Sequence, residues 1–304
     1  MTNTLFQIFG LIAFGALWAF IKPAGLDAET VRRVFSNTVY YLFLPALVLS
    51  ILWKAPLGLD SIRISISAAS GILVSLLAAW LACRMCNSRR DITGAMMLAA
   101  AFPNATYIGL PLLESTFGPW SRSIVLQYDM FACFPLVLTV GFSIANHYGS
   151  TVHKQNPLRS MVNVVPLWAM GIAILLNTGK VPMPEWIGGL LRMMGGAVIP
   201  LMLMSVGLAL RRGLTEWRKL PMVIPVAAIQ LFLMPLVVWG IGYTLGLQGQ
   251  VLHAVVIEGA LPSMALGIVI CDRYGLNTGI YAAALTLTTI ICIITLPLWF
   301  AWVQ

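Results

Sequence analysis

The sequence predicts an all-α polytopic membrane protein. Of its 304 residues, 60% are hydrophobic and only 9% are charged, and the mean hydropathy is +0.91. Ordinary soluble domains carry about 25% charged residues. Apolar stretches of about 20 residues, enough to cross a hydrocarbon core as a helix, alternate with charged or turn-rich segments. Ten transmembrane helices are predicted, at residues 5–21, 39–53, 64–81, 92–113, 123–145, 161–176, 186–210, 223–245, 251–270 and 280–303.

The distribution of basic residues predicts the orientation of these spans. Thirteen lie in alternate loops, namely Lys22, Arg32, Arg33, Arg84, Arg89, Arg90, Lys154, Arg159, Arg211, Arg212, Arg218, Lys219 and Arg273, and four lie in the opposite loops, namely Lys54, Arg63, Arg122 and Lys180. Because cytoplasmic loops carry the excess of Lys and Arg, we expect both termini on the non-cytoplasmic side. The 18 basic against 10 acidic residues therefore reflect orientation, and no nucleic acid partner is expected.

The N-terminus and the cysteines exclude other classes. Residues 1–4 carry no positive side chain, and no small-residue cleavage site follows the first span, so no cleaved signal peptide is expected. The five cysteines are Cys83, Cys86, Cys133, Cys271 and Cys292. They lie within spans or near cytoplasmic ends, where disulfides are rare, and the pair Cys83 and Cys86 lacks a second ligand pair. We expect no metal and no cofactor.

The spans divide into two units of five with the same order of features. The predicted units are residues 1–147 and 161–304, joined by a cytoplasmic loop at 148–160. Pro45 and Pro200, 155 residues apart, lie inside apolar runs, and Gly118 and Gly275, 157 residues apart, close similar polar segments. Since five is odd, the second unit enters the membrane from the opposite side. Such inverted repeats are a common plan of secondary transporters.

The fourth and ninth spans are each interrupted at mid-length by a proline beside a small polar residue. The breaks are Phe102-Pro103-Asn104 and Leu261-Pro262-Ser263. Proline removes a backbone donor and opens the preceding turn, and lipid cannot satisfy the freed groups. Matching breaks in two halves of a membrane protein indicate a transporter's binding site. The alternative is that the breaks only kink packed helices.

Each break is expected to leave a half-helix whose N-terminus points at the middle of the membrane. The unpaired N–H groups and the positive end of the helix dipole favour an anion such as a carboxylate. Asn104 and Ser263 can cap their own half-helices or bind the ligand, and Thr106 and Tyr107 lie within the next turn. The two ends are predicted to converge into one substrate site.

Two carboxylates in the spans are candidates for ion coupling. Glu258 precedes Pro262 by four residues, one helical turn back. Ionisable groups at this depth are costly and suggest function, so Glu258 is predicted to carry a coupling proton or sodium ion. The alternative is a protonated carboxyl that is hydrogen-bonded for packing. Asp129, in the fifth span, is either a second titrating group, part of a cation site with Glu258, or a packed carboxylate.

Other polar residues have simpler interpretations. His253 is expected at the membrane interface, Arg192 is expected to extend its charge to the surface, and Glu114 is expected to be solvated. The last span carries the hydroxyls of Thr286, Thr288 and Thr289. In membrane helices such hydroxyls bond their own carbonyls or a neighbouring helix, and ligand contact is the alternative.

The two break regions resemble the signatures of the auxin efflux carrier family. The first signature is similar to residues 102–112, FPNATYIGLPL, followed by Phe117-Gly118. The second is similar to Leu261-Pro262-Ser263, followed by residues 274–277, YGLN, and the runs 285–288 and 295–298. The resemblance covers nearly the whole chain, and a more distant one is to the bile acid sodium symporter fold.

The resemblance implies ten helices in two inverted repeats, with helices 4 and 9 broken and crossing at their breaks. It implies that helices 3–5 and 8–10 move as a transport domain against a scaffold of helices 1, 2, 6 and 7, often in a homodimer. Substrate contacts carry over to Pro103, Asn104, Pro262 and Ser263. The chain lacks the large hydrophilic loop of the long plant carriers, which favours a compact carrier of the bacterial inner membrane.

The predicted function is secondary active transport of a small organic anion by alternating access. The candidates are carboxylates such as malate, malonate or an auxin-like acid, coupled to protons or sodium. The alternative is a sensor on the same fold that binds an organic anion without moving it. An enzyme is not expected, because His253, Glu258 and Asp129 have neither a paired nucleophile nor metal-ligand spacing.

Overall fold

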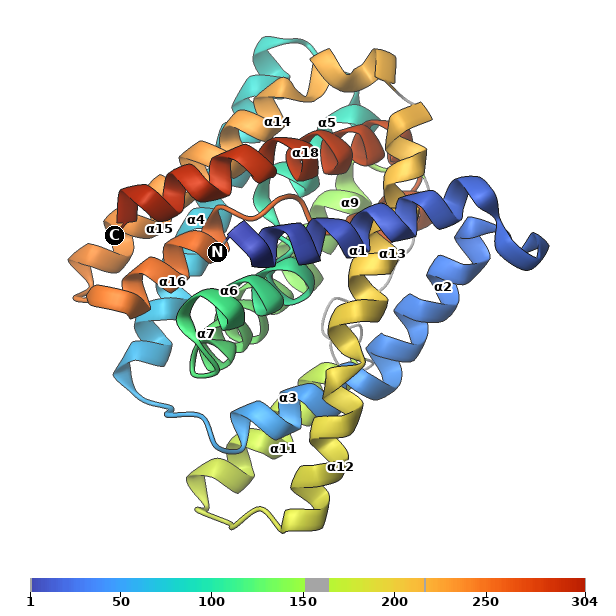
Figure 1. The fold of residues 1–304 in the computed structure, drawn as a ribbon. Helices are drawn as coiled ribbons and strands as arrows, with labels where there is room; N and C mark the ends of the chain where they lie inside the picture. Colours follow the sequence, from blue (N-terminus) through green and yellow to red (C-terminus); the bar gives the residue numbers. More distant parts are fainter. Residues whose placement is uncertain (1, 151–163, 216, 304) are drawn as a thin grey trace.

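The computed structural model describes residues 2–150, 164–215 and 217–303 and folds them into helices (Figure 1). Within these ranges the only β-structure is one isolated bridge, so the described chain is all-α, as predicted. From residue 151 onward the predicted loop at 148–160 lies outside the described residues, and so do Lys154, Arg159 and the start of the predicted span at 161–176.

Within each described range the elements follow one another with short connections. From the N-terminus they are α1 (Thr2–Ile21), η1 (Pro23–Gly25), α2 (Ala28–Thr38), η2 (Val39–Phe43), α3 (Leu44–Leu52), α4 (Leu59–Met85), α5 (Arg90–Ala101), η3 (Ala105–Gly109), α6 (Leu110–Phe117), α7 (Ser121–Tyr128), η4 (Asp129–Cys133), α8 (Phe134–Leu136), η5 (Val137–Gly141) and α9 (Phe142–Tyr148). They continue with α11 (Val165–Thr178), α12 (Glu185–Gly196), α13 (Val198–Thr215), η6 (Trp217–Val223), α14 (Ile224–Ala228), η7 (Ile229–Leu233), α15 (Met234–Thr244), α16 (Gly249–Gly259), α17 (Leu266–Tyr274) and α18 (Thr278–Val303).

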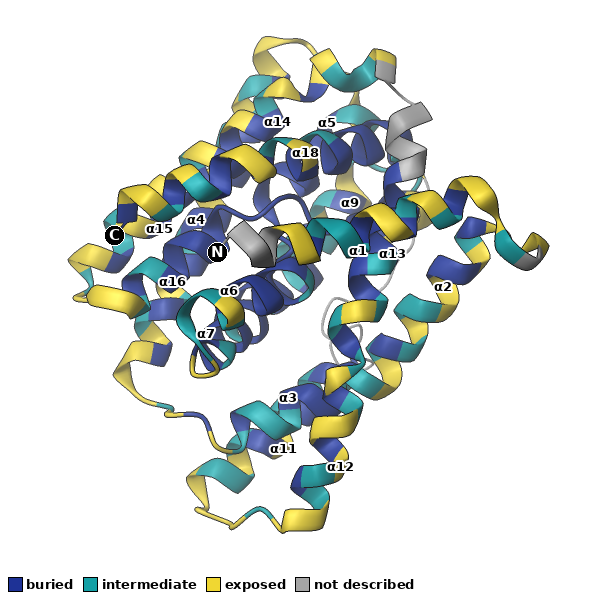
Figure 2. Cartoon of the chain, viewed as in Figure 1, coloured by how far each residue is buried: buried dark blue, intermediate teal, exposed yellow. Residues whose placement is uncertain are grey.

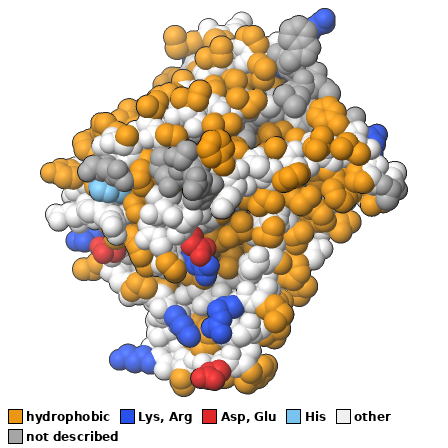
Figure 3. All heavy atoms as spheres, viewed as in Figure 1, with side chains coloured by type: hydrophobic (Ala, Val, Ile, Leu, Met, Phe, Trp, Pro, Cys, Tyr) orange, Lys and Arg blue, Asp and Glu red, His pale blue; other side chains and the backbone are white. Residues whose placement is uncertain are grey.

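Several of these stretches are suited to cross a membrane. In the described residues, six are long and apolar enough, namely Ala28–Leu52, Leu59–Met85, Ser121–Tyr148, Glu185–Leu210, Arg218–Thr244 and Thr278–Val303, and the shorter apolar helices are Phe6–Ile21 and Val165–Thr178. Large apolar side chains such as Phe14, Trp168 and Leu175 are exposed. Figure 3 shows hydrophobic side chains over much of one face, with most charged groups near its edges. The chain is a multi-pass membrane protein.

Proline positions explain the local shape of the helices. The five-residue π-helical turns η2, η3, η4 and η7 end two residues before Pro45, Pro111, Pro135 and Pro235, respectively. Proline lacks an N–H, and its ring clashes with the carbonyl four residues back. The residue just before each proline instead donates its N–H five residues back, as Leu44 does to Val39. The wider turn lets each helix continue past its proline.

Pro45 and Pro200, which occupy corresponding positions in the predicted repeat, differ in local structure. Pro45 follows the π-turn η2, whereas Pro200 lies in the first turn of α13, just after the turn at Ala197 that separates it from α12. Gly118 and Gly275 agree more closely, because they end α6 and α17 with φ of 95° and 67°. Positive φ suits glycine, which has no Cβ.

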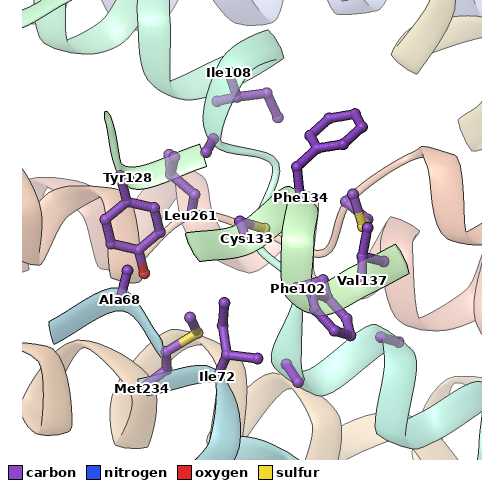
Figure 4. Packing of buried hydrophobic residues seen from close by; sticks show 14 of the residues in the cluster. Ala68, Ile72, Phe102, Ile108, Tyr128, Cys133, Phe134, Val137, Met234 and Leu261 are labelled. Atoms are coloured by element: carbon purple, nitrogen blue, oxygen red, sulfur yellow. The ribbon is translucent and has the colours of Figure 1, made fainter. Parts of the chain in front are cut away.

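The core lies where the middle of the chain meets α16 and α18. Figure 2 shows buried residues concentrated on α5, on α16 and on the inner part of α18, with exposed residues along the outer helices. In Figure 4, Phe102 and Leu261 lie among Cys133, Phe134 and Val137. Phe102 and Leu261 are fully buried. The core therefore surrounds the two segments in which the sequence places its breaks.

Helices α1 and α13 cross at very short range (Figure 1). A Cβ built on Gly207 would meet the backbone of α1, with Gly15 Cα at 2.9 Å, and would collide with the carbonyl oxygen of Ile12. A Cβ built on Gly15 would likewise meet the backbone of Met204, with its Cα at 3.0 Å. Two glycines therefore allow direct backbone contact between the first helix and the second half of the chain.

We expect Gly207→Ala to destabilise the folded protein by about 1–3 kcal/mol, because the added methyl forces the two backbones apart. The measurement is thermal unfolding of the detergent-solubilised protein. Gly171→Ala is the matched control, since a Cβ there meets no atom within 4 Å. Equal melting temperatures for the two variants would contradict the close crossing.

Candidate functional site

The two interrupted segments pair with each other through their backbones. Helix α5 ends at Ala101, Phe102 is extended, and helical structure resumes in η3. Pro103 and Ser263 form an antiparallel β-bridge. The N–H of Asn104 donates to the carbonyl of Pro262 at 2.8 Å, and the N–H of Met264 donates to the carbonyl of Phe102 at 2.9 Å. Each segment thus satisfies polar groups that the other has freed.

Side chains of neighbouring helices hold the second segment from behind. The hydroxyl of Tyr281 donates to the carbonyl of Met264 at 2.7 Å, and the amide of Gln230 donates to the carbonyl of Leu261 at 3.0 Å. Neither residue was predicted from the sequence as part of the site. Gln230 offered a signal, because it is a polar side chain in the middle of an apolar span. Tyr281 offered none.

The hydroxyl of Thr288 on α18 also contacts the second segment. It accepts the N–H of Ser263 at 3.2 Å and lies 2.8 Å from the carbonyl of Ala284 in its own helix. Thr289 bonds only within its helix, to Leu285 at 2.6 Å, and the buried hydroxyl of Thr286 has no partner among the described residues. Intrahelical and interhelical bonds, the expected uses of these hydroxyls, are both present.

Of the two roles given for Asn104 and Ser263, capping their own half-helices is not seen in the structure. The hydroxyl of Ser263 instead donates to the carbonyl of Ala99 in the last turn of α5, at 2.6 Å. Asn104 precedes η3 without a side-chain cap bond. It is 3% exposed, and its Nδ2 has no partner within the described chain. A buried amide donor is therefore left unpaired at the meeting point of the two segments, which is costly unless a ligand or water completes it.

Asp129 lies beside the first segment. It is the first residue of η4 and is buried, and its Oδ2 accepts a hydrogen bond from the hydroxyl of Thr106. A small cavity of about 20 Å³ is lined by Pro103, Asn104, Thr106, Tyr107 and Asp129, among others. It has room for about one water molecule. The structure thus brings the predicted residues of the first segment together with Asp129 in a closed site.

Glu258 lies against the C-terminal end of η3. It is in the last turn of α16 and is fully buried, and neither carboxyl oxygen has a hydrogen-bond partner among the described residues. A Cβ built on Gly109 would lie 2.7 Å from both Glu258 Oε2 and Leu261 Cδ1. The carboxyl is therefore packed directly against the backbone of η3, in apolar surroundings.

Of the larger cavities in the described chain, two have charged side chains in their lining. One, of about 360 Å³, has Arg32, Arg273 and several tyrosines in its lining, and it shares Tyr107, Phe134 and Leu266 with the small cavity. The other, of about 380 Å³, is lined by polar residues that include Lys54, Asp60, Arg122 and Gln127. Both are large enough for a small organic molecule.

The remaining predicted residues lie away from the site. Glu114 is not freely solvated as expected, because it pairs with Arg122 and its side chain is only 24% exposed. His253 is partly exposed on α16, and Arg192 is exposed on α12. In the described part of the chain, no three His, Cys, Asp or Glu residues are grouped as metal ligands.

Comparisons with known proteins agree on one class. The family model described as membrane transport protein matches residues 1–165 and 151–300. An uncharacterized transporter of Methanothermobacter thermautotrophicus is 27% identical over 98% of this chain and 97% of its own length. The uncharacterized transporter YfdV of Escherichia coli is 22% identical over 90% of this chain and 88% of its own length. An uncharacterized transporter of Methanocaldococcus jannaschii is 21% identical over 93% of both chains.

We expect Tyr281→Phe to destabilise the protein by about 1–3 kcal/mol, because the buried carbonyl of Met264 loses its side-chain donor. The melting temperature of the purified protein and the hydrogen exchange of the Met264 amide are the measurements. Tyr243→Phe is the matched control, since Tyr243 is 63% exposed. Unchanged exchange at Met264 would show that the hydroxyl does not hold the second segment.

Proposed function

Because the chain belongs to the membrane transport protein family, which is the auxin efflux carrier family, we propose that this transporter moves a small organic anion by alternating access. The observation that carries the proposal is the meeting of two interrupted segments around the unpaired amide of Asn104. A membrane helix interrupted at mid-depth is tolerated where its backbone is buried in protein or lines a cavity. Both conditions are met here, which supports a binding site.

The proposed architecture is ten membrane spans in two inverted repeats. Support comes from the positions of the interruptions, after α5 in one half and after α16 in the other, and from the glycines that end α6 and α17 with positive φ. Under this proposal α5, η3 and α6 form one broken span, and α16 and α17 form another. The two spans cross at the bridge between Pro103 and Ser263.

The proposed ligand is a carboxylate bound between the two segments. The N-terminal ends of the helical stretches after Asn104 and Ser263 carry partial positive charge, and the free Nδ2 of Asn104 adds a donor. Thr106, Tyr107 and the two prolines, Pro103 and Pro262, complete the proposed site. Malate, malonate and auxin-like acids are candidates. The cavity of about 20 Å³ is too small for any of them, so binding requires the site to open.

The two cavities with charged side chains in their lining are proposed as the access routes to the site. The cavity with Arg32 and Arg273 bears residues of the predicted cytoplasmic loops, and the one with Lys54 and Arg122 bears residues of the opposite loops. Positive side chains at both mouths raise the local concentration of an anion. Tyr107, Phe134 and Leu266 separate the first cavity from the closed site, and we propose that they act as its gate.

Location and assembly are part of the same proposal. We propose that the protein lies in a bacterial inner membrane; the loop charges support an orientation with both termini on the non-cytoplasmic side. Its partners are the lipid bilayer, the organic anion and a second copy in a homodimer. Transport is proposed to be coupled to protons or sodium through Glu258 and Asp129.

We expect Asn104→Ala to weaken carboxylate binding about 10- to 100-fold, because a hydrogen bond to a charged group is worth about 1.5–3 kcal/mol. The measurement is binding and proteoliposome uptake with malonate, malate and indole-3-acetate. Asn146→Ala, at an exposed position on α9, is the matched control. Unchanged affinity in Asn104→Ala would overturn the site, and binding without net flux in the parent protein would identify a sensor.

A further inference from the structure

The packing around Glu258 distinguishes between the two coupling ions. Its side chain is 0% exposed, and both carboxyl oxygens lack a hydrogen-bond partner among the described residues. An ionised carboxylate in such surroundings would lose its hydration without compensation, at a cost of many kcal/mol. The packing seen here is therefore that of the neutral acid.

The neighbouring groups strengthen this conclusion. The titratable side chains that interact electrostatically with the Glu258 carboxyl are Tyr128 of α7 and Asp129 and Cys133 of η4. An ionised Asp129 would have the same sign as an ionised Glu258 and would repel it. Tyr128 does not hydrogen-bond to the carboxyl, because its hydroxyl has no partner within the described chain. Figure 4 shows its ring directed toward Ala68 and Met234.

Space at the carboxyl favours a proton over a metal ion. A bound cation needs several oxygen ligands around it. The carboxyl oxygens instead face Gly109, where even an added Cβ would lie 2.7 Å from Oε2, and the same point is 2.7 Å from Leu261 Cδ1. The second carboxylate is engaged elsewhere, since Asp129 Oδ2 accepts the Thr106 hydroxyl. A proton needs no additional space.

We propose that Glu258 is a proton-binding site whose neutral form holds η3 against α16. This inference rests on the proposed function, because it names the ion coupled to anion movement. On release, the O–H bond of the acid breaks and its proton passes to a water oxygen. The resulting carboxylate must be hydrated, so η3 separates from α16 at Gly109.

The geometry links this event to the substrate site. The N–H groups of Ile108 and Gly109 donate to the carbonyl of Asn104 at 3.1 and 3.4 Å, so η3 joins the two sites as one short unit. A displacement at Gly109 is therefore transmitted to Asn104 and to its backbone bond with Pro262. Proton release and the opening of the paired segments are one motion.

Infrared spectroscopy of the reconstituted protein, without substrate, tests the proton site directly. At neutral pH the parent protein is expected to show the carbonyl band of a protonated buried carboxyl, and Glu258→Gln is expected to remove it. Glu114→Gln is the matched control, because Glu114 is a partly exposed carboxyl away from Glu258 that pairs with Arg122, and the variant should keep the band. A spectrum unchanged by Glu258→Gln would overturn the proposal.

Proteoliposome transport tests the coupling. With one coupled proton, a gradient of about one pH unit is expected to accumulate substrate about tenfold, and a sodium gradient at equal pH is expected to accumulate none. Glu258→Gln should lose the accumulation and retain substrate exchange. Sodium-driven accumulation, or pH-driven accumulation in Glu258→Gln, would overturn the assignment. If the parent protein moves no carboxylate, the transport proposal fails, and the infrared result still decides the proton site.

A second variant tests the same contact without changing Glu258, so the test does not depend on whether Glu258→Gln folds. Gly109→Ala places a methyl where the carboxyl lies, so we expect a shifted carboxyl band and the loss of most of the pH-driven accumulation. Gly240→Ala, where a Cβ meets no atom within 4 Å, is its matched control and should behave like the parent. Equal bands and equal transport in both variants would contradict the contact.

Discussion

The backbone pairing between residues 102–104 and 262–264 is the constraint on which the centre of this protein depends. Lipid offers no hydrogen bonds, and each unsatisfied backbone group there costs several kcal/mol. Neither interrupted segment can satisfy its own groups, because each contains a proline and leaves its helix. The bonds from Asn104 to Pro262 and from Met264 to Phe102 solve the problem for both at once, and Tyr281 and Gln230 satisfy two further carbonyls of the second segment.

The π-helical turns are a second structural feature on which the site depends. They determine which side chains point toward the centre of the protein. Four of them, η2, η3, η4 and η7, widen the helix just before a proline, whereas η5 is not followed by one. Two of them bear on the site. Asp129 begins η4 and bonds to Thr106, and Gly109 ends η3 and lies against Glu258. A change of helical phase by one residue turns the following side chains by about 100°. The prolines thereby set the direction of residues several positions away from themselves.

Much of this could be read from the sequence, and the limits have clear causes. Composition and the apolar stretches are enough to predict an all-α multi-pass protein. The chemistry of proline is enough to predict that two helices are interrupted at Pro103 and Pro262. The partners of the freed backbone groups could not be read, because Tyr281 and Gln230 lie on other helices and a single sequence carries no information on distant neighbours. For the same reason the sequence could not decide between the alternatives for Ser263, whose hydroxyl bonds across to Ala99 and does not cap its own half-helix. The same limit also hid the pairing of Glu114 with Arg122.

The two interrupted segments differ in how many of their polar groups have hydrogen-bond partners in the protein. Ser263 is engaged at two groups, with its hydroxyl on Ala99 and its N–H on Thr288. Asn104 keeps an unpaired donor, and the η3 turn that follows it contacts an acid that has no polar partner among the described residues. Under the proposals made above, the first segment is therefore the one whose contacts a ligand and a proton would both change. Because η3 is a single turn between Asn104 and Gly109, either change would then affect the other.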